Sequence, residues 1–302
     1  MKKFSLLLLY IFSACNCTLQ AESFIKQHDN VYTLLFADFS FSVSAEKGGR
    51  IISFKSGGKE LLTSDSINDR YYGATFWLSP QSQYWPPFRS LDNLPYEAAY
   101  NDKSLRLTSM PDTISGLSIT KEFTVSKADS SVLISYTVRN VSLRPRKLAP
   151  WDVARVHGGL SFFPAATPTA ADKLDVTGCY RDSGIVWVPF IEIADRKAEK
   201  LFSGATGGWL ANFNPEKGLL FIKCFPDIQP GEVPPGQGEV EVYIAPQGKY
   251  TELENHGKYT ELQPGKSLTY NQKWHLKAIS SDKSKPIDRR KILSYINSFI
   301  SR

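Results

Sequence analysis

The sequence predicts an all-β protein, built as a large antiparallel sandwich of two sheets with one short helix at its C-terminal end. Short runs rich in β-branched and aromatic residues recur along the 302 residues, with turn-forming residues between them. Helical periodicity is nearly absent before residue 286, and no low-complexity linker divides the middle of the chain. We therefore expect residues 22–302 to form one domain.

The individual elements follow from local composition. A Pro- and Gly-rich stretch over residues 226–239 indicates a long surface loop. Apolar residues after Pro286 space as one helical face, which predicts a helix over residues 286–301. The predicted strands cover residues 31–36, 39–44, 50–54, 104–109, 118–125, 131–140, 184–190, 218–225, 239–246 and 267–276.

The N-terminal stretch MKKFSLLLLYIFSACNC has the layout of a secretory signal, because two lysines precede an apolar run that is too short to span a bilayer. Residues 1–21 are then a signal peptide removed at an A-x-A-like site. Alternatively, residues 12–15 resemble a bacterial lipobox, in which a lipidated Cys15 would tether the chain to a membrane. We favour the lipobox, and expect an exported protein that is periplasmic or an outer-membrane-anchored lipoprotein.

Charge and cysteine content limit the function further. The formal net charge is +6, but the excess lies at the two ends of the chain, and residues 22–281 are formally neutral. A neutral body lacks the cationic surface that nucleic-acid backbones require, so we exclude a nucleic-acid partner. An oxidising compartment would allow Cys179 and Cys224 to pair, while a buried free thiol at Cys224 is the alternative.

Several chemistries lack their motifs. The mature chain contains no phosphate-binding loop, no G-x-G-x-x-G, no H-E-x-x-H, no C-x-x-C and no nucleophile elbow. The four histidines lie too far apart to give metal-ligand spacing. We therefore expect no cofactor and no dedicated metal site, although a carboxylate-lined cleft could hold Ca²⁺ without a motif.

The pentapeptide KYTEL occurs twice, at residues 249–253 and 258–262. On a strand, the first copy and its extension would place Tyr250, Glu252, Glu254 and His256 on one face. Carboxylates two positions apart on a strand are separated by roughly 6.6 Å, close enough for one charge to raise the pKa of the other in a desolvated site. The alternative is a solvated strand face with ordinary surface charges. The second copy leads into a Pro-Gly turn and carries one carboxylate.

A second candidate stretch covers residues 148–164. Alternation places Trp151, Arg155 and His157 on one strand face, and Asp152 on the other. An indole, a guanidinium and an imidazole together suit a sugar, which offers apolar ring faces and hydroxyl groups. A core tryptophan beside an exposed strand end is the alternative.

A third stretch, residues 74–96, contains four prolines and has five aromatic side chains crowded between positions 76 and 88, so some of its rings have to lie on a loop. Trp85 is the ring there that we expect to stack on a ligand. An aromatic cluster that only anchors the loop is the alternative.

These stretches, together with residues 48–62, resemble the galactose mutarotase-like (aldose 1-epimerase-like) superfamily. They are most similar to an uncharacterised bacterial family of that fold, by a PWD strand, an FFP run, a Y-x-E-L-E strand and an L-x-PG-x-S-L turn before a Trp-containing strand. The resemblance covers most of residues 30–276. It implies a β-supersandwich with a carbohydrate site on a concave sheet face.

The resemblance also implies site residues. Glu254, or Glu252 in a shifted register, matches the late glutamate that takes the anomeric proton in aldose 1-epimerases. Trp151 stands nearest to the position of the family's histidine and cannot transfer a proton, so His157 is the candidate acid. By the same reading Arg50, Asp152 and Arg155 would orient hydroxyls, while Trp85 and Trp151 would stack on the sugar.

The functional hypothesis is an exported carbohydrate-binding protein, with aldose 1-epimerase-like activity as its catalytic form. A non-catalytic glycan-binding accessory protein of a polysaccharide-utilisation system is the alternative. A glycoside-cleaving enzyme that uses Glu252 and Glu254 is a weaker one, because the acid and the base have to flank the scissile bond.

Overall fold

The computed structural model describes residues 24–169, 172–279 and 287–301. The predicted signal peptide and the lipobox at Cys15 lie outside these residues. None of the helices in the described ranges is long and apolar enough to cross a membrane. Cys179 and Cys224 both carry free thiols.

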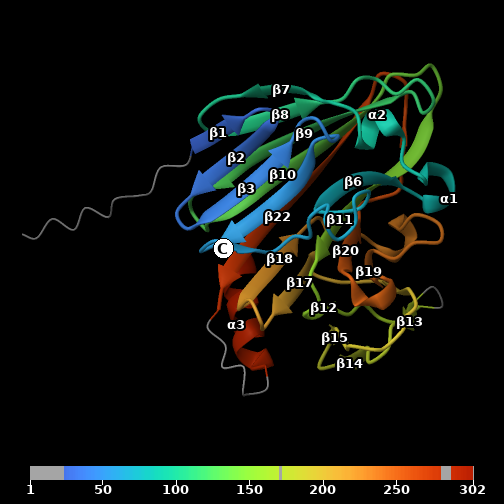
Figure 1. Ribbon diagram of the computed structural model, residues 1–302. Coiled ribbons are helices and arrows are strands. Elements are labelled where there is room, and N and C mark those ends of the chain that lie inside the picture. Colours follow the sequence, from blue (N-terminus) through green and yellow to red (C-terminus); the bar gives the residue numbers. More distant parts are fainter. Residues whose placement is uncertain (1–23, 170–171, 280–286, 302) are drawn as a thin grey trace, which may run out of the picture.

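Two large antiparallel sheets build the fold, which confirms the predicted all-β sandwich and its C-terminal helix (Figure 1). Within the described residues the first sheet has twelve strands, ten of them in the order β1-β2-β3-β4-β6-β11-β20-β19-β16-β13, with β5 beside β4 and β21 beside β11. Its strands are β1 (Phe24–His28), β2 (Val31–Phe36), β3 (Phe39–Ser44), β4 (Arg50–Ser56), β5 (Lys59–Glu60), β6 (Ala74–Ser79), β11 (Arg146–Val156), β13 (Lys173–Asp175), β16 (Glu199–Ser203), β19 (Val240–Ile244), β20 (Thr251–His256) and β21 (Thr260–Leu262).

The second sheet has ten strands in the described part of the chain, in the order β14-β15-β12-β17-β18-β22-β10-β9-β8-β7. These are β7 (Glu97–Tyr100), β8 (Ser104–Thr108), β9 (Leu117–Ser126), β10 (Ser131–Asn140), β12 (Leu160–Pro164), β14 (Tyr180–Asp182), β15 (Ile185–Pro189), β17 (Trp209–Asn214), β18 (Leu219–Cys224) and β22 (Ser267–Ala278).

The helices are short and peripheral. The C-terminal helix α3 packs Ile292, Ile296 and Phe299 against the outer face of the second sheet, and Asp288 caps its first turn by accepting from the Lys291 amide. The 226–239 stretch contains only a single 3₁₀ turn, as its composition predicted. The helices are α1 (Gln81–Tyr84), α2 (Arg89–Asp92), α3 (Arg289–Ile300) and the 3₁₀ turns Pro230–Glu232 and Pro246–Gly248.

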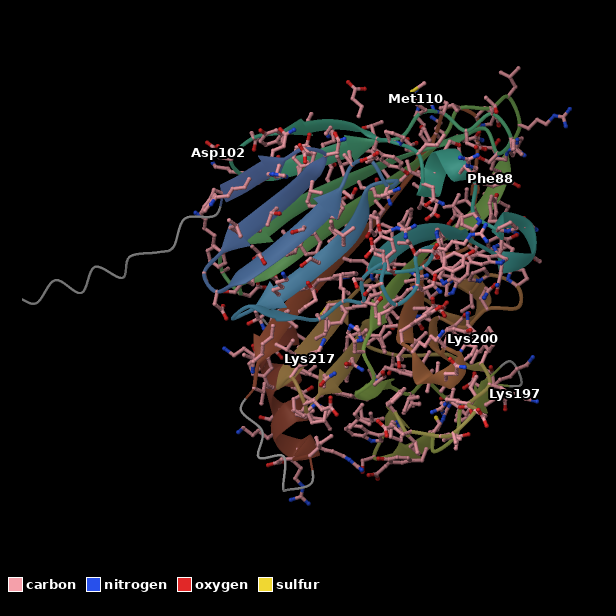
Figure 2. All side chains as sticks on the ribbon, viewed as in Figure 1. Phe88, Asp102, Met110, Lys197, Lys200 and Lys217 are labelled. Atoms are coloured by element: carbon pink, nitrogen blue, oxygen red, sulfur yellow. The ribbon has the colours of Figure 1, made fainter. Side chains whose placement is uncertain are left out.

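The main hydrophobic core lies between the sheets and takes apolar side chains from both, such as Phe41 and Phe54 from the first and Phe123 and Phe221 from the second. Both sheets contribute side chains to this core, and Figure 2 draws the described side chains on the ribbon. Alternation explains it, since the buried positions of β2, β9 and β10 follow one another at every second residue.

The two KYTEL copies pair with the same strand. The first copy begins β20, which pairs with residues 151–156 of β11, and the second forms β21, which pairs with residues 146–148 of β11. β11 lies between β6 and β20 and so sits near the centre of the first sheet. The registers place Trp77 and His256 on either side of Trp151, and Thr75 and Glu254 on either side of Val153.

Candidate functional site

The outer face of the first sheet carries a buried group of ionisable side chains at the centre of β11, β20, β19 and β16. We call Lys200, Glu241, Glu254 and His256 the acid–base cluster. The side chains of Glu241, Glu254 and His256 are fully buried, and that of Lys200 is 21% exposed. Cross-strand pairing explains their meeting, because Glu254 lies opposite Glu241 and one step from His256 on the same face.

The ammonium of Lys200 joins the two carboxylates of this cluster. It lies 2.7 Å from Glu241 Oε2 and 3.0 Å from both oxygens of Glu254. Glu254 Oε2 also accepts a 2.7 Å hydrogen bond from the indole nitrogen of Trp151. Burial raises the pKa of Glu254 to about 7, against the opposing effect of Lys200 and with that of the Glu241 charge. Glu254 is therefore poised to exchange a proton near neutral pH.

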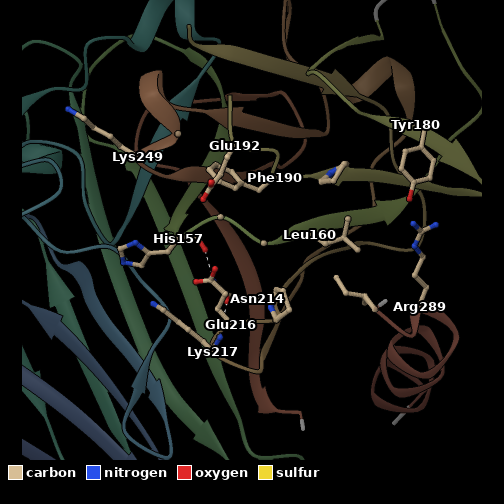
Figure 3. A pocket seen from close by; sticks show the side chains of 16 residues that line it. His157, Leu160, Tyr180, Phe190, Glu192, Asn214, Glu216, Lys217, Lys249 and Arg289 are labelled. Atoms are coloured by element: carbon tan, nitrogen blue, oxygen red, sulfur yellow. Dashed lines mark hydrogen bonds between the residues drawn. The ribbon is translucent and has the colours of Figure 1, made fainter. Parts of the chain in front are cut away.

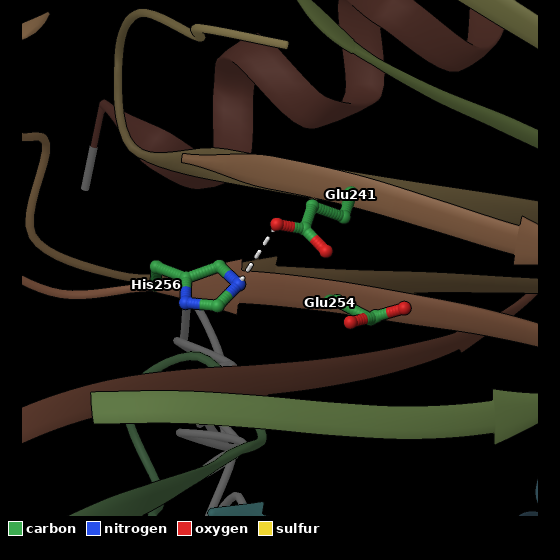
Figure 4. Close-up of side chains that lie close together, drawn as sticks. All are labelled: Glu241, Glu254 and His256. Atoms are coloured by element: carbon green, nitrogen blue, oxygen red, sulfur yellow. Dashed lines mark ion pairs between the residues drawn. The ribbon is translucent and has the colours of Figure 1, made fainter. Parts of the chain in front are cut away.

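His256 is held at both ring nitrogens. Nδ1 lies 3.0 Å from the hydroxyl oxygen of Ser79, and Nε2 lies 3.2 Å from Glu241 Oε1 (Figure 4). The same oxygen accepts hydrogen bonds from the Gln237 side chain and the Gly238 amide. Burial by itself would raise the pKa of Glu241, but His256 and Lys200 outweigh it and hold that pKa well below its usual range. Glu241 is thus the ionised member of the carboxylate pair.

Glu241, Glu254 and His256 bring three potential metal-ligand atoms within 4.8 Å of one another. The donor set would suit Zn²⁺ or a similar cation. The Lys200 ammonium, however, already lies between the two carboxylates and supplies the positive charge there. At the two carboxylates, Lys200 thus supplies the positive charge that a metal ion would bring.

A second group lies beside the cluster and consists of aromatic rings. Trp77, Trp85 and Trp151 contact one another with ring centroids 4.8–6.0 Å apart, and Tyr71 packs 5.6 Å from Trp85. Trp77 and Trp151 are buried, whereas Tyr71 and Trp85 are half-buried. We call these four rings the aromatic wall. It belongs partly to strands and partly to the loop after α1, as the prolines of residues 74–96 predicted.

Arg155 and Glu252 connect the wall to the cluster. The Arg155 Nε atom lies 2.7 Å from Glu252 Oε1, and its guanidinium lies over the Trp77 ring at 5.0 Å. One of its terminal nitrogens contacts Thr75 Oγ1 at 3.3 Å, while the other, Nη2, is buried and has no hydrogen-bond partner among the described residues. The Glu252 side chain is 13% exposed and so reaches the surface.

The structure brings Trp85, Trp151, Arg155, Glu252 and Glu254 of the predicted site together on one face. Arg50 is buried, and its guanidinium lies 3.6 Å from Asp92 and donates to the Arg70 carbonyl oxygen. Asp92 in turn accepts a 2.7 Å hydrogen bond from the Trp77 indole. Arg50 thus contacts the carboxylate that holds Trp77, and because its side chain is buried it does not line the exposed side of the aromatic wall.

The placement of Asp152 with the site residues was wrong. Strand alternation turns its side chain to the opposite face of β11, into the space between the sheets. There it is fully buried, with Asp152 Oδ1 2.6 Å from the ammonium of Lys223 on β18 and Oδ2 accepting from Tyr136. Asp152 cannot touch a ligand on the outer face.

The pairing of His157 with Glu254 was also wrong. His157 follows the end of β11, roughly 13 Å along the strand from the residue opposite Glu254. It lines a separate groove of about 910 Å³ together with Leu160, Phe190, Lys217 and Arg289 (Figure 3). Burial lowers its pKa, and the Lys217 charge adds to that effect.

Sequence reasoning missed Lys200, Glu241 and Trp77, and gave His256 no role. Glu241 had a detectable signal, since E-V-E-V-Y alternates in the same way as the neighbouring T-E-L-E-N-H. Lys200 had none, because it lies on a short strand whose pairing with β19 follows from tertiary structure alone.

Comparisons with known proteins agree with this architecture. A TPR-domain containing protein from Parabacteroides distasonis is 14% identical, with a TM-score of 0.58 over 86% of this chain and 50% of its own. Galactose mutarotase-like proteins from Lactobacillus casei and Clostridium acetobutylicum are 12% and 9% identical, with TM-scores of 0.56 and 0.54. The alignments cover 84% and 85% of this chain, and 100% and 99% of those two chains. At such identities the likeness establishes the galactose mutarotase-like fold.

In sequence, no curated protein matches the chain significantly. A family model does match it, over residues 86–277, which is more than half of the chain and includes β11, β16, β19 and β20. The chain therefore belongs to the family of the domain of unknown function DUF4380.

Proposed function

We propose that this protein is an exported carbohydrate-binding protein whose ligand lies against the aromatic wall and the Arg155–Glu252 pair. The observation that carries the proposal is the meeting of half-buried rings with a guanidinium–carboxylate pair on one sheet face. Sugars present C–H faces that stack on rings and hydroxyls that bridge carboxylates and guanidinium groups. The galactose mutarotase-like fold supports the same class of ligand by analogy.

Arg155 gives the proposal a specific contact. Its Nη2 atom is a buried donor without a protein partner in the described residues. Such a donor is costly unless something accepts from it. Because the Arg155 side chain is fully buried, a ligand hydroxyl would have to enter between Trp77 and Glu252 to accept that hydrogen bond and donate one to the carboxylate.

Exposure decides which groups a ligand meets first. Glu252 of the Arg155–Glu252 pair and Lys200 of the acid–base cluster are partly exposed. The side chains of Glu241 and Glu254, by contrast, are fully buried. Tyr71 and Trp85 are the accessible rings. The ligand would therefore lie over Trp85, Glu252 and Lys200, with the acid–base cluster as the floor of the site.

Binding is tested by titrating the purified mature chain with a panel of mono- and oligosaccharides and following tryptophan fluorescence and heat. We expect Trp85→Ala and Glu252→Gln each to weaken binding at least tenfold. Tyr100→Ala is the matched control, because this ring is 48% exposed and lies on β7 of the other sheet. Equal binding by all three variants would refute the site, and no binding by the parent chain would refute the function.

Export rests on the N-terminal sequence and has its own test. Expression of the full chain in a bacterium, followed by fractionation and mass spectrometry of the mature N-terminus, distinguishes three outcomes. A lipidated Cys15 means a lipoprotein, cleavage near Ala21 means a soluble exported chain, and an intact Met1 in the cytoplasm contradicts export.

A second candidate function is anomer interconversion, which the Glu254 pKa of about 7 favours. Glu254 would take the anomeric hydroxyl proton while an acid protonates the ring oxygen, so that the C1–O bond of the ring opens and recloses on either face. Both nitrogens of His256 are already engaged, and the two carboxylates outweigh burial and raise the pKa of Lys200, which makes it a weak acid. For this reason we place binding first.

Polarimetry separates the two functions. Fresh α-glucose or α-galactose should equilibrate faster with the protein present if it is an epimerase, and Glu254→Gln should abolish the acceleration. Binding without acceleration supports the accessory role. Cleavage of a glycosidic bond is disfavoured, because Glu252 and Glu254 lie on one strand and so cannot flank the scissile bond from opposite sides.

A further inference from the structure

One charged side chain interrupts the apolar inner face of β18. Leu219, Phe221 and Lys223 alternate on that face, and all three are fully buried. The Lys223 ammonium reaches across the core to the first sheet, where it lies 2.6 Å from Asp152 Oδ1. A buried lysine placed among phenylalanine and leucine calls for a physical reason, since burial lowers its pKa and opposes its charge.

The contacts of Lys223 show where the charge acts. Its ammonium donates a 2.9 Å hydrogen bond to the carbonyl oxygen of Leu253 and lies 3.4 Å from that of Asp152. Asp152 belongs to β11 and Leu253 to the neighbouring strand β20. One ammonium therefore contacts both strands from beneath, while Asp152 is held a second time by Tyr136 of β10.

The candidate site lies directly above this contact. Trp151 and Val153 flank Asp152 on the outer face of β11, and Glu252 and Glu254 flank Leu253 on the outer face of β20. The Trp151–Glu254 hydrogen bond and the Arg155–Glu252 pair both span these two strands. Their lengths depend on how β11 and β20 lie relative to each other.

Stability alone gives little reason for the pair. Well-packed apolar residues usually replace a buried ion pair at no cost to stability, because desolvation of two charges offsets their attraction. The Lys223 charge is nevertheless coupled to the site. Burial lowers the pKa of Lys223, Asp152 raises it, and the Glu254 carboxylate raises it as well. The influence is mutual, so Lys223 acts on Glu254 through the sheet.

We propose that Lys223 and Asp152 are positioning residues, which fix β11 against β20 and so set the geometry of the site above them. This role deepens the proposed carbohydrate site, but its main test needs no sugar. The pair touches no ligand and acts only through Trp151, Glu252 and Glu254.

The test replaces both charges together, as Lys223→Met with Asp152→Leu, because a single replacement would leave the other charge buried and unpaired. The Trp151 indole N–H resonance, observed in protein labelled with ¹⁵N-tryptophan and assigned with Trp151→Phe, reports the 2.7 Å bond to Glu254. We expect an unchanged or higher unfolding midpoint, together with a shifted Trp151 resonance and faster exchange of its proton. Where sugar binding is measurable, the dissociation constant should rise at least tenfold.

Two internal references make the result specific. The Trp77 indole donates to Asp92 and should keep its resonance. The ion pair of Lys273 with Asp129, at 2.7 Å and away from the site, supplies the control variant Lys273→Met with Asp129→Leu. If the Met/Leu variant does not fold, Lys223→Gln with Asp152→Asn keeps the shape and removes the charges.

An unchanged Trp151 resonance in a folded variant overturns the positioning role, whatever happens to sugar binding. A shifted resonance in a parent protein that binds no sugar keeps the positioning role and refutes the proposed function instead. A loss of stability that leaves the resonance and the affinity unchanged assigns the pair to the core alone, and also overturns the proposal.

Discussion

Trp151 and Glu254 lie on adjacent strands and are joined by a 2.7 Å hydrogen bond from the indole nitrogen to Glu254 Oε2, with both side chains buried. The indole therefore reports directly on the protonation state of the Glu254 carboxyl. The Lys200 ammonium also lies 5.4 Å from the Trp151 ring centre. Each change in the acid–base cluster should be visible at Trp151.

The first prediction concerns pH. The pKa of Glu254 is about 7, against 4.5 for an unburied glutamate. The folded chain thus binds this proton more tightly than the unfolded chain, and the stability gained is complete below pH 4.5 and lost as pH rises through 7. Relative to Glu254→Gln, the wild-type chain should lose about 3 kcal/mol of unfolding free energy over that window. Urea titrations at pH 5 and 8 measure it.

The same titration has a spectroscopic counterpart. The Trp151 indole resonance should move with a midpoint near pH 7 in the wild-type chain and stay fixed in Glu254→Gln. A stability difference that does not vary with pH, or a midpoint near 4.5, would contradict the raised pKa.

Strand alternation explains how much of the site could be predicted. Once β11 and β20 are accepted as strands, their periodicity alone sends Trp151, Arg155, Glu252 and Glu254 to one face and Asp152 to the other. The grouping of Asp152 with the site came from the family resemblance and contradicted that rule. Local pattern was the better guide here.

The remaining parts of the site depend on which strands become neighbours. Lys200 and Glu254 are 54 residues apart and meet because β19 lies between their strands. Ser79, which holds His256, comes from 177 residues earlier in the chain. No spacing rule relates such positions, so a histidine chosen by its closeness in sequence to Trp151, His157, proved to line another groove.

The second prediction concerns Lys200→Met. Removing the ammonium leaves Glu241 and Glu254 facing each other without the cation that joins them, so the pKa of Glu254 should rise further. The variant should lose about 3 kcal/mol of unfolding free energy at pH 8 and less at pH 5, where Glu254 is protonated. Lys197→Met, at an exposed position close by in sequence, is the control. Equal losses at both pH values would exclude the proposed charge balance.

The third prediction is that Lys200→Ala creates a metal site. With the ammonium gone, ligand atoms of Glu241, Glu254 and His256 remain within 4.8 Å of one another, close to the spacing around a bound Zn²⁺. Co²⁺ should bind this variant with visible absorption bands and bind the wild-type chain at least tenfold more weakly. Adding His256→Gln should remove the bands. Equal Co²⁺ affinity of wild type and variant would show that Lys200 does not occupy the position.

The fourth prediction concerns the docking of α3. His275 lies on β22, with Nδ1 3.1 Å from the Ser130 carbonyl oxygen and Nε2 2.6 Å from the Tyr295 hydroxyl of α3. Burial lowers the pKa of His275, and the charges of Lys273 and Lys277 lower it further. The Asp129 charge raises it, but the pKa remains below its usual value. The neutral ring is therefore the folded form, and stability should fall as pH drops below 6.5, by at most about 1.4 kcal/mol per pH unit.

Hydrogen exchange and urea unfolding between pH 7.5 and 5 test this prediction. Amides of α3 should lose protection before those of β18, and His275→Phe should be less stable at pH 7.5 but insensitive to acid over this range. Acid sensitivity that persists in His275→Phe would assign the effect to another group.

The last prediction uses two glycines with similar backbones and different surroundings. Gly48 has a φ of +65°, and a Cβ there would lie 2.0 Å from the Asp92 carbonyl oxygen, whereas Gly57 has a φ of +54° and open space around it. Alanine at either position lowers the free energy of unfolding by about 1 kcal/mol, because both backbones are left-handed. Gly48→Ala must in addition push α2 away, and with it the Asp92 side chain that holds Trp77 and Arg50.

We expect Gly57→Ala to lose about 1 kcal/mol with an unchanged Trp77 indole resonance, and Gly48→Ala to lose several times more and to shift that resonance. Similar losses in both variants would mean that α2 yields without strain, and that the aromatic wall does not depend on its position.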